Sequence, residues 1–240
     1  MQWEVLFMHD KQVWTNQNIQ YMFHEHIYEY DMVAASLSIS KRFQLLDNDL
    51  ITQLNLMKKE DRVVKIGLLQ RENKDFSESL LSGIRDIRQK FIIQNNLTED
   101  DIIALHSDAV FMKTKRKVIT EIEGVKFAKK GEWTSFIRYK NIDMYYANDF
   151  IKYQNINKDM LMEQTLGMNL HIKKIFQMLE DYDEDVFTYL SKFQMQYLQD
   201  KLPQQYYVPF GRVGADYKAY NMQLLAYLAN VVIEETKQWR

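Results

Sequence analysis

Residues 102–112 read IIALHSDAVFM, two short apolar runs around the dipeptide Ser107-Asp108. Apolar runs separated by two turn-forming residues are typical of a β-hairpin, with Asp108 at its turn. A second aspartate, Asp31, ends the apolar strand in residues 27–39, IYEYDMVAASLSI. A carboxylate in such surroundings is costly unless it is paired, hydrogen-bonded or bound to a cation. Two of them predict a site at which both carboxylates converge on a hard metal ion.

Composition narrows the classes of protein. The chain has 240 residues, a hydrophobic fraction of 46% and no cysteine. This length predicts one large domain or two small ones, with a core that needs no disulfide. The lack of cysteine excludes thiol nucleophiles and cysteine-ligated zinc or iron-sulfur sites. With seven glycines and neither a G-x-x-x-x-G-K nor a G-x-G-x-x-G string, P-loop and Rossmann folds lose their main support.

Composition and charge also bear on where the protein is located and on what it binds. No run of 18 apolar residues and no signal sequence occur, which predicts a cytoplasmic protein without a membrane span. Few glycines and prolines with many Lys, Asn and Ile residues suggest an AT-rich, viral genome, and hence the host cytoplasm. The net charge of −2 counts against tight, unassisted DNA binding.

The pattern along the chain predicts an α+β fold, with an antiparallel sheet flanked by helices over residues 1–155 and a helical region over 156–240. Strands are expected at 3–8, 26–33, 102–106, 109–113, 118–122, 125–128, 134–139 and 142–146. Helices are expected at 34–46, 49–58, 77–95, 160–180, 184–202 and 216–238, and residues 61–71 fit either type. The apolar stripes of the C-terminal helices suit either a core or the surface for a protein partner.

The two aspartate segments resemble the palm of family B DNA polymerases. The family's first palm motif reads approximately D-x-x-S-L-Y-P-S-I, and residues 31–39 read DMVAASLSI. Its third palm motif reads approximately Y-x-D-T-D-S-I-F-V, and residues 105–112 read LHSDAVFM. The helix expected at 77–95 lies where the family has a helix leading into the third motif. The resemblance covers roughly residues 25–145 and implies a palm-like sheet.

The resemblance also implies a function. Asp31 and Asp108 are the implied catalytic residues and the ligands of Mg²⁺, with Mn²⁺ as an alternative ion. The substrates are nucleoside triphosphates and a primer-template nucleic acid, whose duplex the segment containing Lys140 would contact. On charge alone, Arg62, Lys65 and Arg71 are the best candidates for binding the triphosphate.

The sequence departs from the family at informative positions. His106 replaces the other aspartate of the third motif, and the fingers motif K-x-x-x-N-S-x-Y-G is absent. Ser36 stands at the position of the tyrosine that excludes the ribose 2′-hydroxyl, so ribonucleotides or primase-like synthesis are expected. These departures leave open a non-catalytic interaction or assembly subunit with a degenerate palm. His24 and His26 alternate on one strand, and we favour a polar strand edge there over a zinc or manganese site.

Overall fold

The structure is a computed structural model that describes residues 12–114, 116–156, 166–210 and 217–239. The chain forms two compact units. Unit 1 comprises Met1–Gln17 and Ile27–Glu132, and unit 2 comprises Asn18–His26 and Trp133–Arg240. The strands within residues 133–154 therefore share a compact unit with the C-terminal helices. The sequence pattern, by contrast, changes from strands to helices near residue 155, where the boundary was expected.

Unit 1 contains a six-stranded sheet with the strand order β1-β4-β5-β3-β7-β6. Its strands are β1 (Val13–Thr15), β3 (Ile27–Met32), β4 (Ile102–His106), β5 (Ala109–Lys113), β6 (Glu121–Ile122) and β7 (Val125–Trp133). The β4–β5 hairpin pairs antiparallel with β3 on one side and with β1 on the other. The hairpin and the strand that carry the two aspartates are thus direct neighbours.

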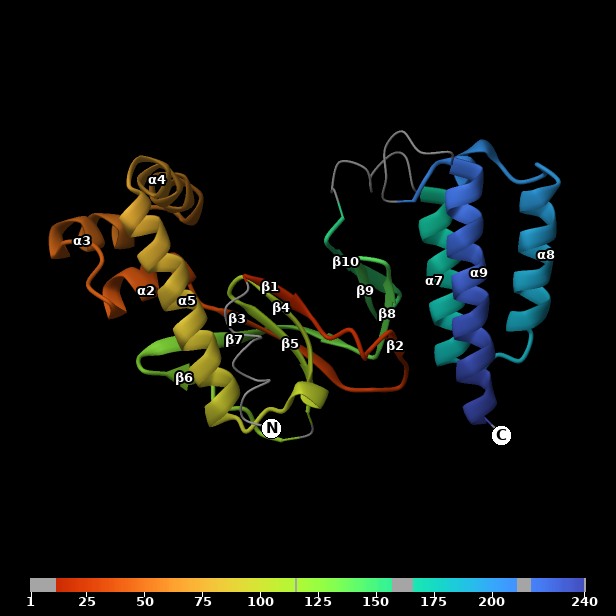
Figure 1. The fold of residues 1–240 in the computed structure, drawn as a ribbon, viewed down its shortest axis with the longest axis horizontal. Coiled ribbons are helices and arrows are strands. Elements are labelled where there is room, and N and C mark those ends of the chain that lie inside the picture. The colour runs from red at the N-terminus through yellow and green to blue at the C-terminus, as the bar shows by residue number, and fades with distance from the viewer. Residues whose placement is uncertain (1–11, 115, 157–165, 211–216, 240) are drawn as a thin grey trace. The chain divides into compact units, whose positions relative to one another are not determined.

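Four helices separate β3 from β4 in the chain. They are α2 (Ala35–Arg42), α3 (Asn48–Leu56), α4 (Lys59–Glu72) and α5 (Lys74–Gln94). α5 lies along the sheet (Figure 1). The helices α2, α3 and α4 lie near the first half of α5 (Figure 1). The apolar stripe of α5, which includes Leu80, Ile87 and Phe91, forms one core with Leu105 and Val110 of the sheet. The apolar side chains of α5 repeat with the helical period of 3.6 residues, and their burial against one face of the sheet holds the helix in place.

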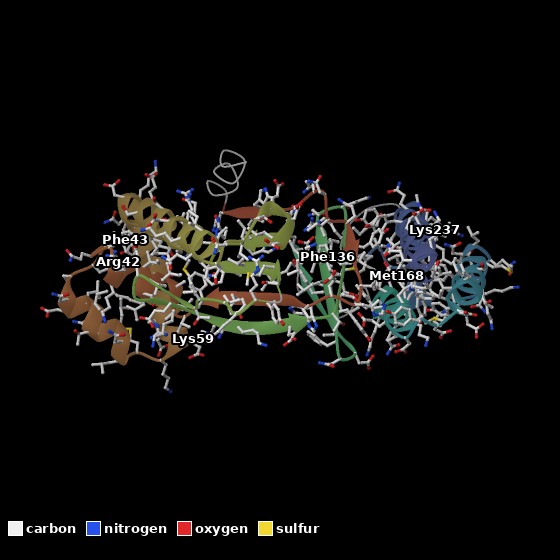
Figure 2. The ribbon with its side chains drawn as sticks, turned by 90° about the horizontal axis from the view of Figure 1, so that it is seen from below. Arg42, Phe43, Lys59, Phe136, Met168 and Lys237 are labelled. Atoms are coloured by element: carbon white, nitrogen blue, oxygen red, sulfur yellow. The ribbon has the colours of Figure 1, made fainter. Side chains whose placement is uncertain are left out.

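Unit 2 combines a four-stranded sheet, in the order β10-β9-β8-β2, with three α-helices in its described residues. The strands are β2 (Tyr21–Met22), β8 (Ser135–Tyr139), β9 (Ile142–Ala147) and β10 (Phe150–Gln154). The helices α7 (Leu166–Glu180), α8 (Val186–Leu198) and α9 (Tyr217–Thr236) run side by side (Figure 1). Phe136 and Met168, labelled in Figure 2, are both fully buried in this unit.

Short 3-10 turns complete the described chain. They are η1 (Glu99–Asp101), η2 (Gln204–Tyr207) and η3 (Lys237–Trp239). None of the helices in the described ranges combines the length and the apolar character that crossing a membrane requires.

The structure confirms the predicted α+β class, the antiparallel sheets and the helical C-terminal half. The strands at 102–106 and 109–113 have the predicted bounds. The ambiguous segment 61–71 lies in helix α4, and the predicted helix over 34–46 ends at Arg42, just before Gln44 takes a left-handed φ of 53°. Asp47 and Asn73 accept backbone hydrogen bonds from Leu50 and Phe76, which fixes the starts of α3 and α5.

Other boundaries differ from the sequence expectations. β10, at 150–154, was not predicted, and the strand expected at 118–122 is reduced to the two residues of β6. The strand expected at 3–8 and the first residues of the helix expected at 160–180 lie outside the described residues.

Candidate active site

A cleft of about 540 Å³ opens in unit 1 where β3 leads into α2. Asp31 at the end of β3 and Asp108 in the β4–β5 turn both line this cleft. Both side chains are partly buried. The remaining lining comes from the start of α2, one face of α4 and Lys130 of β7. The structure therefore brings together the two aspartates that the sequence singled out.

Strand pairing explains why the two aspartates line the same cleft. They lie 77 residues apart in the chain. In the antiparallel register of β3 and β5, Asp31 stands opposite Ala109, the residue that follows Asp108. The backbone N–H of Met32 also donates a hydrogen bond to the carbonyl oxygen of Asp108 at 3.3 Å. A change of register by one residue would move Asp31 to the other face of the sheet, so the hydrophobic pattern of β3 also specifies this site.

The turn that carries Asp108 is held by a buried arginine. Arg88 of α5 is 0% exposed, and its Nη1 donates to the carbonyl oxygen of Ser107 at 2.6 Å. The same Nη1 donates to the carbonyl oxygen of Gln12 at 3.3 Å, and the backbone N–H of Ser107 donates to that carbonyl at 2.8 Å. Ser107 itself has a left-handed φ of 54°. Since this conformation costs a non-glycine residue about 1–2 kcal/mol, these contacts hold the turn in its shape.

One face of α4 supplies basic groups to the cleft. Residues 59, 62, 63, 66, 67 and 70 line it, which is the spacing of a single helical face. Lys59 and Arg62 place two positive charges there, and Lys130 adds a third. Lys59 lies in the helical part of unit 1 (Figure 2). Two carboxylates and three cations lining one cleft suit a ligand that combines a divalent cation with phosphates.

The first turn of α2 is the third component of the cleft. Ala34, with φ and ψ both at 49°, precedes this eight-residue helix, and no side chain caps it. The N–H groups of Leu37 and Ser38 both donate to the carbonyl oxygen of Ala34, and residues 34–37 line the cleft. The partial positive charge of a helix N-terminus favours an anion at this position. Ser36, the predicted position of sugar selection, is among the lining residues.

Other predicted residues lie elsewhere. Lys65 and Arg71 are exposed on α4 and are not among the residues that line the cleft. Lys140 belongs to unit 2, where its Nζ donates to Gln223 and lies 4.2 Å from the ring centroid of Tyr220. The ring of His106 packs edge-on against Phe111, with 5.5 Å between centroids. His24 stacks on Tyr182 at 4.2 Å.

Sequence reasoning missed three residues that the cleft uses. Lys59 and Gln70 lie on the same face of α4 as Arg62, and Lys130 ends a basic run. The signal for Lys59 was its spacing of three residues from Arg62, which places both on one face once the segment is known to be a helix. No sequence pattern indicated which lysine of residues 126–130 lines the cleft.

The family model of the bacteriophage PBS1 gene 130 protein matches residues 5–239 of the chain. The chain belongs to this phage family. The comparison with curated proteins gives no match. The family description indicates viral origin, as the composition suggested, and states no activity, so the resemblance to a polymerase palm stays a prediction.

In this member of the PBS1 gene 130 family, burial raises the pKa of the Asp108 carboxyl above its ordinary value. A hydrogen bond from its own backbone and the positive charge of Arg88 act in the opposite direction without cancelling the effect of burial. Burial also lowers the pKa of Arg88, to about 10, so the guanidinium remains charged at neutral pH. The protein therefore neutralises the negative charge of the Asp108 carboxylate only in part. This leaves the carboxylate suited to binding a cation.

The two carboxylates fit magnesium better than a metal that needs a complete protein cage. Within the described ranges, no group of three or more His, Asp or Glu side chains gathers at one place to hold a metal. Mg²⁺ is commonly bound by one or two carboxylates, with phosphate oxygens and water as the other ligands. For such an ion, Asp31 and Asp108 are the two carboxylates that line the cleft and could hold it.

Asp108→Asn is expected to raise the melting temperature of the metal-free protein at pH 7. Because the pKa of Asp108 is raised in the folded state, folding penalises its charged form, and the penalty is present only above the ordinary pKa of 3.8. The gain should therefore be absent below about pH 4, grow as the pH rises toward the folded-state pKa, and stay constant above it. Thermal unfolding in EDTA across pH 3–8 measures it. If the melting temperature of Asp108→Asn were lower than that of the wild type at pH 7, burial of the charged Asp108 would not be destabilising, which would contradict the prediction.

Proposed function

We propose that unit 1 is a magnesium-dependent nucleotidyltransferase that adds nucleotides to the 3′ end of a nucleic acid. The single observation that carries the proposal is the cleft, which is lined by Asp31, Asp108, the cations of α4 and the N-terminus of α2. The palm resemblance supports the same reaction, because it concerns the same two aspartates. A phage enzyme of this type would act in the cytoplasm of its host.

The cleft groups suit the demands of phosphoryl-type transfer. Such reactions depend on positioning and on electrostatic stabilisation rather than on a protein nucleophile. Asp31 and Asp108 would hold and orient the magnesium ion, whose Lewis acidity would serve to polarise phosphate oxygens and activate the attacking hydroxyl. Lys59 and Arg62 would neutralise the charge of the triphosphate, and the partial positive charge at the N-terminus of α2 would favour it.

His106 does not weaken this proposal. It stands where the polymerase family has another aspartate, but its side chain packs on Phe111 and does not line the cleft. The carboxylate that does line the cleft from this hairpin is Asp108. The substitution therefore leaves the proposed pair of magnesium ligands intact.

A primer-extension assay tests the proposed function. Wild-type protein is incubated with a labelled primer-template, the four deoxynucleotides or the four ribonucleotides, and Mg²⁺ or Mn²⁺. We expect metal-dependent extension that EDTA abolishes, and acceptance of ribonucleotides because Ser36 leaves room for a 2′-hydroxyl. A folded protein that incorporates neither type of nucleotide, with or without a primer, would contradict the proposal.

Exposed apolar residues on α8 favour a second function, the docking of a protein partner by unit 2. Phe187, Met195 and Leu198 are 45%, 58% and 56% exposed, and their spacing places them near one face of the helix. Light scattering tests self-association through this face. A dimer that Met195→Glu dissociates would support it, and a monomer at every concentration would oppose it.

A further inference from the structure

Gly67 stands in the interior of α4, where glycine destabilises a helix relative to alanine. Glycines in helices are usually explained by close packing, as at Gly83 of α5, where an added Cβ would lie 2.6 Å from Cγ2 of Ile39. Around Gly67 an added Cβ would meet nothing within 4 Å. No contact within the described protein therefore explains why this position lacks a side chain.

The space beside Gly67 belongs to the candidate active site. Gly67 lines the cleft together with Val63, one turn earlier, and Gln70, one turn later. The chemical character of this face of α4 changes along the helix. Lys59 and Arg62 come first and are basic, Val63 and Gly67 follow and are apolar or bare, and Gln70 ends the face with an amide. Val63 is 60% exposed, so its side chain is open to a ligand in the cleft.

We propose that Val63 and the bare backbone at Gly67 form the subsite against which the sugar and base of a nucleoside triphosphate pack, with its phosphates at Lys59 and Arg62. This inference rests on the proposed function and assigns the orientation of its substrate. Arg62 and Gly67 differ by about 7.5 Å along the helix axis, so the phosphates and the base would contact different turns of α4. A side chain at position 67 would occupy the space of the ligand rather than that of the protein.

The variant Gly67→Ala tests whether the glycine serves a ligand subsite. For a subsite, the variant should be more stable than the wild type but should bind ATP more weakly. The alanine should raise the melting temperature by about 2–4 °C, since it improves helix propensity in a chain of this size. It should also weaken the binding of ATP in the presence of Mg²⁺ by about tenfold, because one methyl group fills space meant for the ligand. Gly67→Leu should weaken the binding further. Calorimetric titration of ATP and Mg²⁺ into the full chain measures the affinity.

Val64→Ala is the matched control. Val64 lies on α4 but is not among the residues that line the cleft, and alanine there also improves helix propensity. It should raise stability and leave ATP binding unchanged. If wild type binds ATP and both Gly67 variants bind it equally well, the subsite is refuted and the proposed function stands. If wild type binds no nucleoside triphosphate, both the subsite and the proposed function are refuted.

Discussion

Replacing either Asp31 or Asp108 by asparagine is expected to reduce nucleotide incorporation at least about a hundredfold, because each removes charge that stabilises the transition state. Asparagine keeps the size of the side chain but cannot supply the negative oxygen that magnesium prefers. The two carboxylates line one cleft and would act on one metal-nucleotide complex. The double variant should therefore be little worse than either single variant, since residues that act as a unit are not additive.

Asp100→Asn is the matched control for these two variants. Asp100 is an exposed carboxylate in the turn before β4 and takes no part in the cleft. It should retain the activity of the wild type in the same primer-extension assay. Unchanged activity in Asp31→Asn or Asp108→Asn, measured on protein with a normal unfolding transition, would show that incorporation takes place elsewhere.

Arg88→Met is expected to destabilise the protein by about 2–3 kcal/mol and to weaken the response to magnesium, because it removes charged hydrogen bonds from a buried turn. The guanidinium contacts the carbonyl oxygens of Ser107 and Gln12, and without it both lose their charged donor. The left-handed Ser107 is then free to relax, and Asp108 moves with it. Arg88 acts through Asp108, so it is a positioning residue rather than a catalytic one.

Magnesium dependence distinguishes this role from a purely structural one. In Arg88→Met the concentration of Mg²⁺ that gives half-maximal activity should rise, and Arg88→Lys should recover part of the loss through its single charged donor. Arg116→Met, at an exposed arginine of unit 1, should change neither quantity. Equal Mg²⁺ dependence in wild type and Arg88→Met would show that Arg88 contributes only to stability.

The bounds of the strands around Asp108 could be predicted to the residue, because two apolar runs flank a two-residue turn. The register shift between Ile102 and Ala104 in this hairpin could not be predicted from that pattern. The start of α3 at Asp47 was predictable for a similar local reason, since its side chain caps the helix. The extent of β10 was not predictable, because its residues are half-exposed and alternate weakly. The pairing of β10 with β9 overrides its local preference.

The candidate site was only partly predictable. The two aspartates could be identified because carboxylates are rare beside apolar strands. The basic residues of α4 were chosen by charge alone, while the segment was ambiguous between a strand and a helix. Helical phase places Arg62 at the cleft and leaves Lys65 and Arg71 exposed outside it. Lys59 has the right phase but precedes the ambiguous segment, so charge without periodicity could not find it.

Binding of a divalent cation between Asp31 and Asp108 is tested most directly by anomalous diffraction from crystals grown with Mn²⁺ and a nucleoside triphosphate. We expect one or two manganese peaks in the cleft of unit 1, within coordination distance of carboxylate oxygens of both aspartates. The peaks should disappear in Asp108→Asn. A wild-type cleft without manganese, with the two carboxyl groups pointing apart, would contradict the proposed site.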